Sequence, residues 1–212
     1  MKSQLAGWWC VRAAAMGLGL VVLVSTVTAR AAEDEPVIGD TAPAWQDLVG
    51  TDDQKYSLND QKSDVIVLCF TCNGCPYAVD YEDRLIALQK KFKDAGSSVQ
   101  VIAINSNAVA ADELPKMKER AAAKKFNFPY VRDETQEVAK AYAAIYTPEF
   151  YVLNKARQIV YRGAMDDSTK AENVKVRYVE LAVAAALDGK TPEVTKTGAR
   201  GCAIRFKRRR RR

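Results

Sequence analysis

The sequence predicts an α/β fold in which a central mixed β-sheet is flanked by helices on both faces. Short apolar runs bounded by polar residues, typical of buried strands, alternate along the chain with segments of helical periodicity. The last two apolar runs are separated by a four-residue polar loop, 154–157, which is a hairpin signal. We therefore expect early parallel strands joined through helices and a late antiparallel pair.

The elements are expected in the order β-α-β-α-β-α-β-β-α. After an extended segment at 38–45 and a short strand or bend at 56–58, we expect strands at 65–70, 99–105, 128–131, 150–153 and 159–163. Helices are expected at 76–93, 114–126, 135–142 and 171–188. Pro76 suits the first turn of a helix, and Gly96 and Gly189 are typical helix-ending residues.

The first 31 residues have the composition of a signal peptide. A basic start precedes the apolar run 13–24, and Ala29-Arg30-Ala31 has the small-x-small pattern of a cleavage site. The alternative is an uncleaved membrane anchor, although the apolar run is shorter than the ~20 residues that span a bilayer. We expect an exported protein, periplasmic or extracellular, with one domain at 32–204 and a basic disordered tail at 205–212.

The net charge of +6 is concentrated at the two ends of the chain. Residues 1–31 hold three basic residues and no acidic one, and residues 205–212 hold seven basic residues. The part between them has 22 basic against 26 acidic residues, which argues against nucleic-acid binding. We expect a monomer whose tail is solvated, with weak contact to an anionic surface as the alternative.

The run Cys72-Asn73-Gly74-Cys75-Pro76 stands directly between the expected strand 65–70 and the helix 76–93. A helix N-terminus stabilises a thiolate, and the thiolate is the nucleophile of disulfide exchange. We expect Cys72 to face solvent with a lowered pKa and to attack, and Cys75 to be shielded and to resolve the mixed disulfide. The alternatives are a permanent disulfide or half of a metal site.

Other residues extend or limit this site. Thr147-Pro148 stands before the strand 150–153, where a cis bond would leave the Thr147 backbone free to pair with an extended substrate. Cys202 follows the last helix as a further resolving thiol or disulfide partner, or as a lone thiol. Glu149 is a candidate for proton transfer or simply an exposed residue. Cys69, in a buried strand, is expected to act as a small hydrophobe.

The strand, the unit Cys72-x-x-Cys75-Pro76, the helix, and Thr147-Pro148 before a hairpin and a final helix resemble the thioredoxin superfamily. The long segment between the two motifs is similar to that of the redoxin and alkyl hydroperoxide reductase/thiol-specific antioxidant branch. The resemblance covers roughly residues 36–204 and implies a thioredoxin-like fold and thiol–disulfide exchange. The chain departs from thioredoxins at Thr71 and Ile66, where they place Trp and Asp, and it lacks the Pro-x-x-x-Thr-x-x-Cys loop of peroxiredoxins.

The function expected from these features is that of an exported thiol–disulfide oxidoreductase. Its partners would be protein disulfides or dithiols and an unidentified electron donor or acceptor. No cofactor and no metal are expected, and the chain has no His residue. A thiol peroxidase that reduces hydroperoxides is one alternative, and a non-catalytic interaction module on a thioredoxin scaffold is the other.

Overall fold

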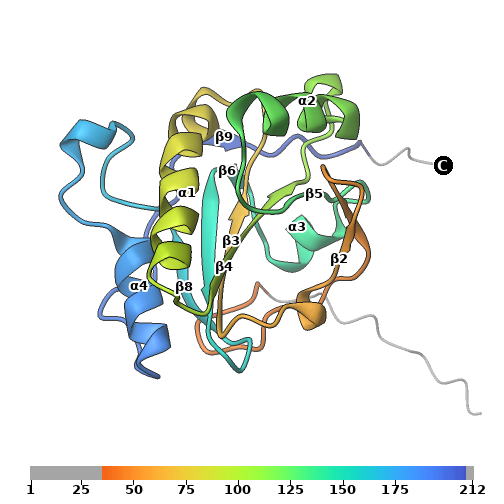
Figure 1. Ribbon diagram of the computed structural model, residues 1–212. Coiled ribbons are helices and arrows are strands. Elements are labelled where there is room, and N and C mark those ends of the chain that lie inside the picture. The colour runs from red at the N-terminus through yellow and green to blue at the C-terminus, as the bar shows by residue number, and fades with distance from the viewer. Residues whose placement is uncertain (1–34, 209–212) are drawn as a thin grey trace, which may run out of the picture. The chain divides into compact units, whose positions relative to one another are not determined.

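A seven-stranded mixed sheet forms the centre of the protein, of which a computed structural model describes residues 35–208 (Figure 1). The strand order in this sheet is β2-β1-β5-β4-β3-β7-β8. Its strands are β1 (Leu48–Gly50), β2 (Lys55–Tyr56), β3 (Val65–Phe70), β4 (Val99–Asn105), β5 (Tyr130–Arg132), β7 (Glu149–Leu153) and β8 (Ile159–Gly163). The expected signal peptide at 1–31 and the end of the tail, 209–212, lie outside the described residues.

The predicted strand directions are confirmed. β3 pairs parallel with β4, and β4 pairs parallel with β5, whereas β7 is antiparallel to both β3 and β8. All six residues of β3 are buried, as a central strand covered on both faces requires. β1 was not predicted, because its three residues form too short a run to show periodicity.

Helices cover both faces of the sheet, as predicted. The helices are α1 (Pro76–Asp94), α2 (Leu114–Lys124), α3 (Glu137–Ala141) and α4 (Tyr178–Leu187). α1, α2 and α4 pack on the face that carries Val65, Val67 and Cys69. α3 packs on the opposite face, with Ile66 and Leu68. This alternation of burial along β3 creates two hydrophobic cores, one on each side of the sheet.

The last helix is shorter than predicted. It begins at Tyr178, and residues 171–173 form a separate 3₁₀ turn, whereas the sequence predicted one helix over 171–188. The side chain of Asp167 accepts the N–H groups of Lys175 at 2.9 Å and Val176 at 3.1 Å. These hydrogen bonds hold the segment just before Tyr178 in an extended conformation, which the β-branched Val176 favours.

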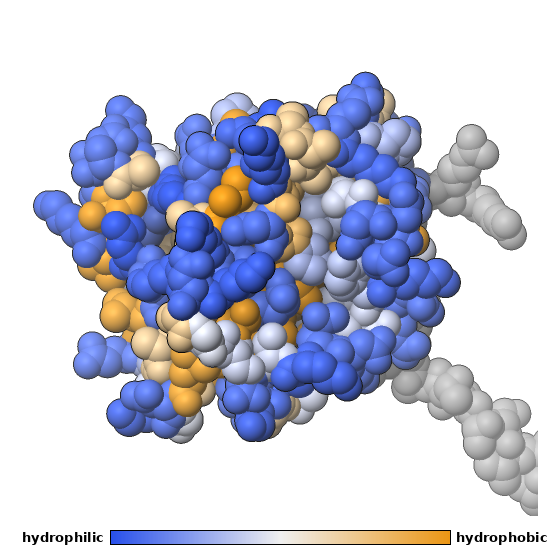
Figure 2. Space-filling view, viewed as in Figure 1, coloured by the Kyte–Doolittle hydropathy of each residue, from blue (hydrophilic) through white to orange (hydrophobic). Residues whose placement is uncertain are grey.

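The exposed surface is mostly hydrophilic in the view of Figure 2, with hydrophobic side chains gathered over α1 and α4. On α4, Leu181 and Leu187 are exposed, while the opposite side of the helix is buried against the sheet. Among the described residues, no helix combines the length and apolar character needed to cross a membrane.

A second, two-stranded sheet joins residues 146–147 to the C-terminal part of the chain. β6 (Tyr146–Thr147) pairs antiparallel with β9 (Cys202–Ala203), so that Thr147 lies opposite Cys202. The chain after β9 stays in contact with the body, because the Lys207 ammonium pairs with the Glu134 carboxylate. Contacts with the body thus continue past Ile204, the predicted end of the domain, to Arg205 and Lys207.

Candidate active site

The two cysteines of the sequence motif lie where β3 ends and α1 begins. Thr71 N–H donates to the carbonyl of Ile104 at 2.9 Å, which extends the β3–β4 pairing up to Cys72. Cys75 is the N-cap of α1, with extended backbone angles, and Pro76 occupies the first turn. The motif therefore places both thiols at the positive end of a 19-residue helix.

Both thiols contact Thr147, although 72 or more residues of chain separate them from it. Cys72 Sγ lies 3.3 Å from Thr147 Oγ1, and the Cys75 thiol donates to the Thr147 carbonyl at 3.1 Å. The Thr147–Pro148 peptide bond is cis. Cys202 joins the same cluster, because its N–H donates to Cys75 Sγ at 3.3 Å. All the predicted site residues thus lie together.

The prediction that Cys72 faces solvent is wrong for this arrangement. Cys72 is 3% exposed and Cys75 is 2% exposed, whereas Cys202 is partly exposed. All three cysteines are free thiols. A motif at a strand–helix junction fixes where the backbone turns, but it does not show that a distant part of the chain returns to cover it.

The expected lowering of the Cys72 pKa is also wrong for this arrangement. Burial raises the pKa of the Cys72 thiol to about 11; the hydrogen bond with Thr147 opposes this rise, and the Asp112 carboxylate adds to it. The desolvation of a thiolate here outweighs the helix N-terminus, which carries only about half a unit of positive charge.

Cys75 is the thiol whose ionised form the surroundings favour. Burial acts to raise the pKa of Cys75, but hydrogen bonds from the Cys202 thiol and from the N–H groups of Ala78 and Cys202 outweigh burial and lower it. The same contact raises the pKa of Cys202 to about 11, with burial as the second cause. The contact between these two residues thus favours the ionised form at Cys75 and the protonated form at Cys202.

Two residues considered from the sequence have structural roles. Cys69 is fully buried in β3, as expected, and burial raises its thiol pKa. Glu149 is only 3% exposed, so the prediction of an exposed residue is wrong. Its carboxylate accepts the N–H groups of Ile145 and Tyr146 at 3.0 and 3.3 Å and pairs with Arg162 at 3.2 Å. Glu149 thus holds β6, the strand that carries Thr147.

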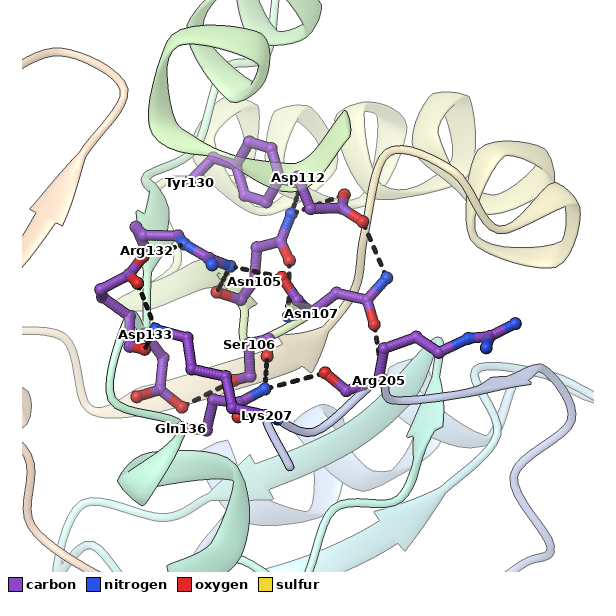
Figure 3. Close-up of polar contacts among 11 residues, drawn as sticks. Asn105, Ser106, Asn107, Asp112, Tyr130, Arg132, Asp133, Gln136, Arg205 and Lys207 are labelled. Carbon is purple, nitrogen blue, oxygen red and sulfur yellow. Dashed lines mark hydrogen bonds and ion pairs between the residues drawn. The ribbon is translucent and has the colours of Figure 1, made fainter. Parts of the chain in front are cut away.

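A buried polar network below the motif was not predicted (Figure 3). Asp112 is fully buried, and its Oδ1 accepts the N–H of Asn73 at 2.6 Å and the amide of Asn105 at 3.0 Å. Its Oδ2 accepts the amide of Asn107 at 2.7 Å. Tyr130 donates its hydroxyl proton to Asn73 Oδ1 at 2.9 Å. The network fixes Asn73, the first of the two residues between the cysteines.

The same network reaches the C-terminal segment, as Figure 3 shows. Asn107 Oδ1 accepts the N–H of Arg205 at 2.6 Å, and the Gln136 amide donates to the Arg205 carbonyl at 2.9 Å. The N–H of Lys207 donates to Gln136 Oε1 at 2.7 Å. The only sequence signal for this network is a set of polar residues at the ends of apolar strands, which does not identify the partners.

The donor set of the site does not suggest a metal centre. Within residues 35–208, no three His, Cys, Asp or Glu side chains are arranged to hold a metal ion. The chemistry available at the site is that of three thiols, a threonine hydroxyl and backbone groups. Such a set can break and form disulfide bonds.

The fold and this thiol pair at the N-terminus of α1 define a thioredoxin-like protein of the redoxin branch. The chain belongs to the AhpC/TSA family, whose model matches residues 38–162. That membership indicates an oxidoreductase in general terms. No curated protein matches the sequence.

Solved structures share this fold. A conserved uncharacterised protein from Geobacillus kaustophilus is 35% identical, with a TM-score of 0.74 over 81% of this chain and 93% of the other. A hypothetical protein from Sinorhizobium meliloti is 30% identical, with a TM-score of 0.74 over 81% and 95%. The thioredoxin domain of a thiol-disulfide oxidoreductase from Bacteroides vulgatus, 21% identical with a TM-score of 0.51 over 59% and 87%, shares the fold.

Proposed function

We propose that the protein is an exported thiol–disulfide oxidoreductase whose redox centre is the Cys72–Cys75 pair. The observation that carries this proposal is the contact of both thiols with one residue, Thr147, at 3.3 and 3.1 Å. Three residues apart at a helix N-terminus, the two sulfurs are spaced for reversible disulfide formation. The leader-like composition of residues 1–31 supports export, where disulfides persist.

The reaction follows from the two thiols. The Cys72 thiolate attacks a substrate disulfide, forms a mixed disulfide and releases one substrate thiol. The Cys75 thiolate then attacks Cys72 Sγ, which closes the Cys72–Cys75 disulfide and releases the second substrate thiol. The substrate gains two electrons and two protons, and the enzyme loses them. Run in reverse, the same steps oxidise a dithiol.

The substrate class is proposed from the edge beside the thiols. Thr147 belongs to a strand whose partner is a short segment, so an extended polypeptide can pair with it by the same backbone bonds. A protein disulfide presented on such a strand would place its sulfur near Cys72. In the structure this edge is covered by β9, so substrate access requires β9 to move.

The test is the reduction of insulin disulfides by dithiothreitol, measured with purified protein that begins after residue 31. Cys72→Ser and Cys75→Ser are each expected to lower the catalysed rate at least ~100-fold, because each removes one sulfur of the exchange. The control is Cys69→Ala, since Cys69 is a thiol in the same strand region but lies outside the cluster. It is expected to keep the wild-type rate and to lose only about 1 kcal/mol of stability.

Two results would contradict the proposal. Equal rates for wild type and Cys72→Ser would favour a binding module on this scaffold. No insulin reduction, together with consumption of one equivalent of hydrogen peroxide by Cys72 within seconds, would favour a peroxidase.

A further inference from the structure

The C-terminal segment of the chain lies on the edge that the proposed function gives to a substrate. β9 pairs antiparallel with β6, with Cys202 opposite Thr147. Thr147 donates its hydroxyl proton to the Cys202 carbonyl at 3.3 Å, and Ile204 N–H donates to the Ile145 carbonyl at 2.9 Å. The protein's own chain therefore makes the backbone contacts expected of an extended substrate strand.

The fit of this segment depends on a glycine. A Cβ atom added to Gly201 would collide with the carbonyl oxygen and carbon of Thr147. Only a residue without a side chain lets the backbone approach Thr147 this closely. Three residues later, Ile204 is buried in the core on the α3 face of the sheet.

Further contacts fix the register of the segment. The N–H and carbonyl of Arg205 are both paired, the carbonyl with the N–H of Ala108 at 2.8 Å and with the Gln136 amide. The N–H of Arg205 donates to Asn107 Oδ1 (Figure 3). Because backbone atoms are held on both sides of Ile204, Cys202 has one defined position beside the thiol pair.

That position brings a third sulfur to Cys75. The N–H of Cys202 donates to Cys75 Sγ at 3.3 Å. Cys202 packs against the small cluster formed by Cys72, Cys75 and Ala78. Of the three thiols, Cys202 is the most exposed one, since Cys72 and Cys75 are 3% and 2% exposed. An external thiol reagent therefore reaches Cys202 first.

We propose that Cys202 is a third redox-active thiol, which β9 delivers to Cys75 as an internal substrate and which exchanges disulfides with it. The proposal rests on the proposed function of the Cys72–Cys75 pair and adds the route by which electrons reach that pair from outside.

The step is a disulfide exchange within one chain and needs no outside oxidant. In the oxidised protein, the Cys202 thiolate attacks Cys75 Sγ, and the bond between Cys75 and Cys72 breaks. Cys72 leaves as a thiolate and takes up the proton that Cys202 lost. The product is a Cys75–Cys202 disulfide, which an external dithiol reduces by attack at the exposed Cys202 sulfur.

The first test traps this bond in the Cys72→Ser variant. One equivalent of oxidised glutathione is added to the reduced protein, free thiols are alkylated, and disulfides are mapped by mass spectrometry without reduction. We expect Cys75 and Cys202 to be linked to each other, with release of two equivalents of glutathione. The control, Cys72→Ser with Cys202→Ser, should stop at a glutathione adduct of Cys75. Stable glutathione adducts in the single variant, without the internal bond, would overturn the proposal.

The second test uses the intact pair and measures how fast dithiothreitol reduces the oxidised protein. Cys202→Ser is expected to slow this reduction about tenfold, and Ala203→Ser, the adjacent exposed position on β9, should leave it unchanged. Reduction of Cys202→Ser at the wild-type rate would overturn the role of Cys202.

A third experiment distinguishes failure of the proposed role of Cys202 from failure of the proposed function of the Cys72–Cys75 pair. Pre-reduced protein is mixed with insulin for a single turnover, which needs only Cys72 and Cys75. If pre-reduced wild type and Cys202→Ser both reduce insulin, the function of the pair stands, whatever the role of Cys202. If pre-reduced wild type does not react, the proposed function itself fails.

Discussion

At the scale of single residues, the site differs from a simple nucleophile–resolver pair in where its negative charge is stabilised. Cys75 Sγ accepts the N–H of Cys202, and although burial acts to raise the pKa of Cys75, hydrogen bonds with Cys202 and Ala78 lower it. At Cys72 burial outweighs the hydrogen bonds with the Thr147 side chain and the Cys75 backbone, and it raises the pKa of that thiol to about 11. The surroundings of the two sulfurs therefore favour the ionised form at Cys75, which the mechanism uses second, over the ionised form at Cys72.

This distribution predicts a two-part thiolate titration, followed by the ultraviolet absorbance of the reduced protein. Cys75 should have a pKa below its ordinary value, and Cys72 and Cys202 should have pKa values of about 11. The raised pKa values of Cys72 and Cys202 contribute stability that is fully present when the pH is below the ordinary thiol pKa. This contribution is lost as the pH rises toward 11. The lowered pKa of Cys75 contributes stability above its ordinary value, which is lost as pH falls through the folded-state pKa.

The control for this titration is Cys75→Ser. It should abolish the low step and lower the pKa of Cys202, because the hydrogen bond with Cys75 is the main cause that raises it. A low step that survives in Cys75→Ser would contradict the assignment of the thiolate.

At the scale of elements, β9 and the loop before α1 are linked through the buried Asp112. Its carboxylate accepts N–H groups from Asn73, Asn105 and Asn107. The Oδ1 atom of Asn107 in turn accepts the N–H of Arg205. Buried carboxylates satisfied in this way hold their donors in fixed positions. The C-terminal segment with β9, which covers the thiols, and the loop that carries Cys72 and Cys75 are thus held by the same network.

Gly201→Ala is the sharpest test of this cover. The added methyl group collides with Thr147, so β9 should detach at a cost of about 1–3 kcal/mol. Alkylation of Cys75 at fixed pH should then be at least ~10-fold faster, because local opening exposes it. Gly198→Ala is the matched control, since an added Cβ there meets no atom within 4 Å and should change nothing. Equal alkylation rates in both variants would show that β9 does not cover the thiols.

At the scale of the whole molecule, local signals in the sequence were sufficient for the sheet and for the motif. The apolar run of β3, Pro76 and the hairpin loop at 154–157 each act over a few residues, and the structure confirms the elements that they predict. The pairing of β9 with β6 joins Cys202 to Thr147 across 55 residues, and Asp112 joins Asn73 across 39. Neither contact has periodicity or a turn signal, so the sequence could name Cys202 as a candidate but not place it.

Burial is the property of the site that sequence patterns predicted least well. Whether Cys72 faces solvent depends on the return of the chain's end to β6, and this return rests on Gly201, Ile204 and the amides of Asn107 and Gln136. Each of these residues is unremarkable within its own segment. The sequence predicted a lowered pKa for Cys72. In the fold, where these residues come together, the pKa of Cys72 is raised and that of Cys75 is lowered.

The most direct test of the central claim is a redox equilibrium of the protein that begins after residue 31. The protein is equilibrated in mixtures of reduced and oxidised dithiothreitol, quenched with acid, alkylated and mapped by peptide mass spectrometry. We predict that Cys72 and Cys75 change together, reversibly, as one two-electron couple, while Cys69 stays reduced throughout. If the thiols of Cys72 and Cys75 remain alkylatable at every ratio of reduced to oxidised dithiothreitol, the pair is not a disulfide-exchange centre.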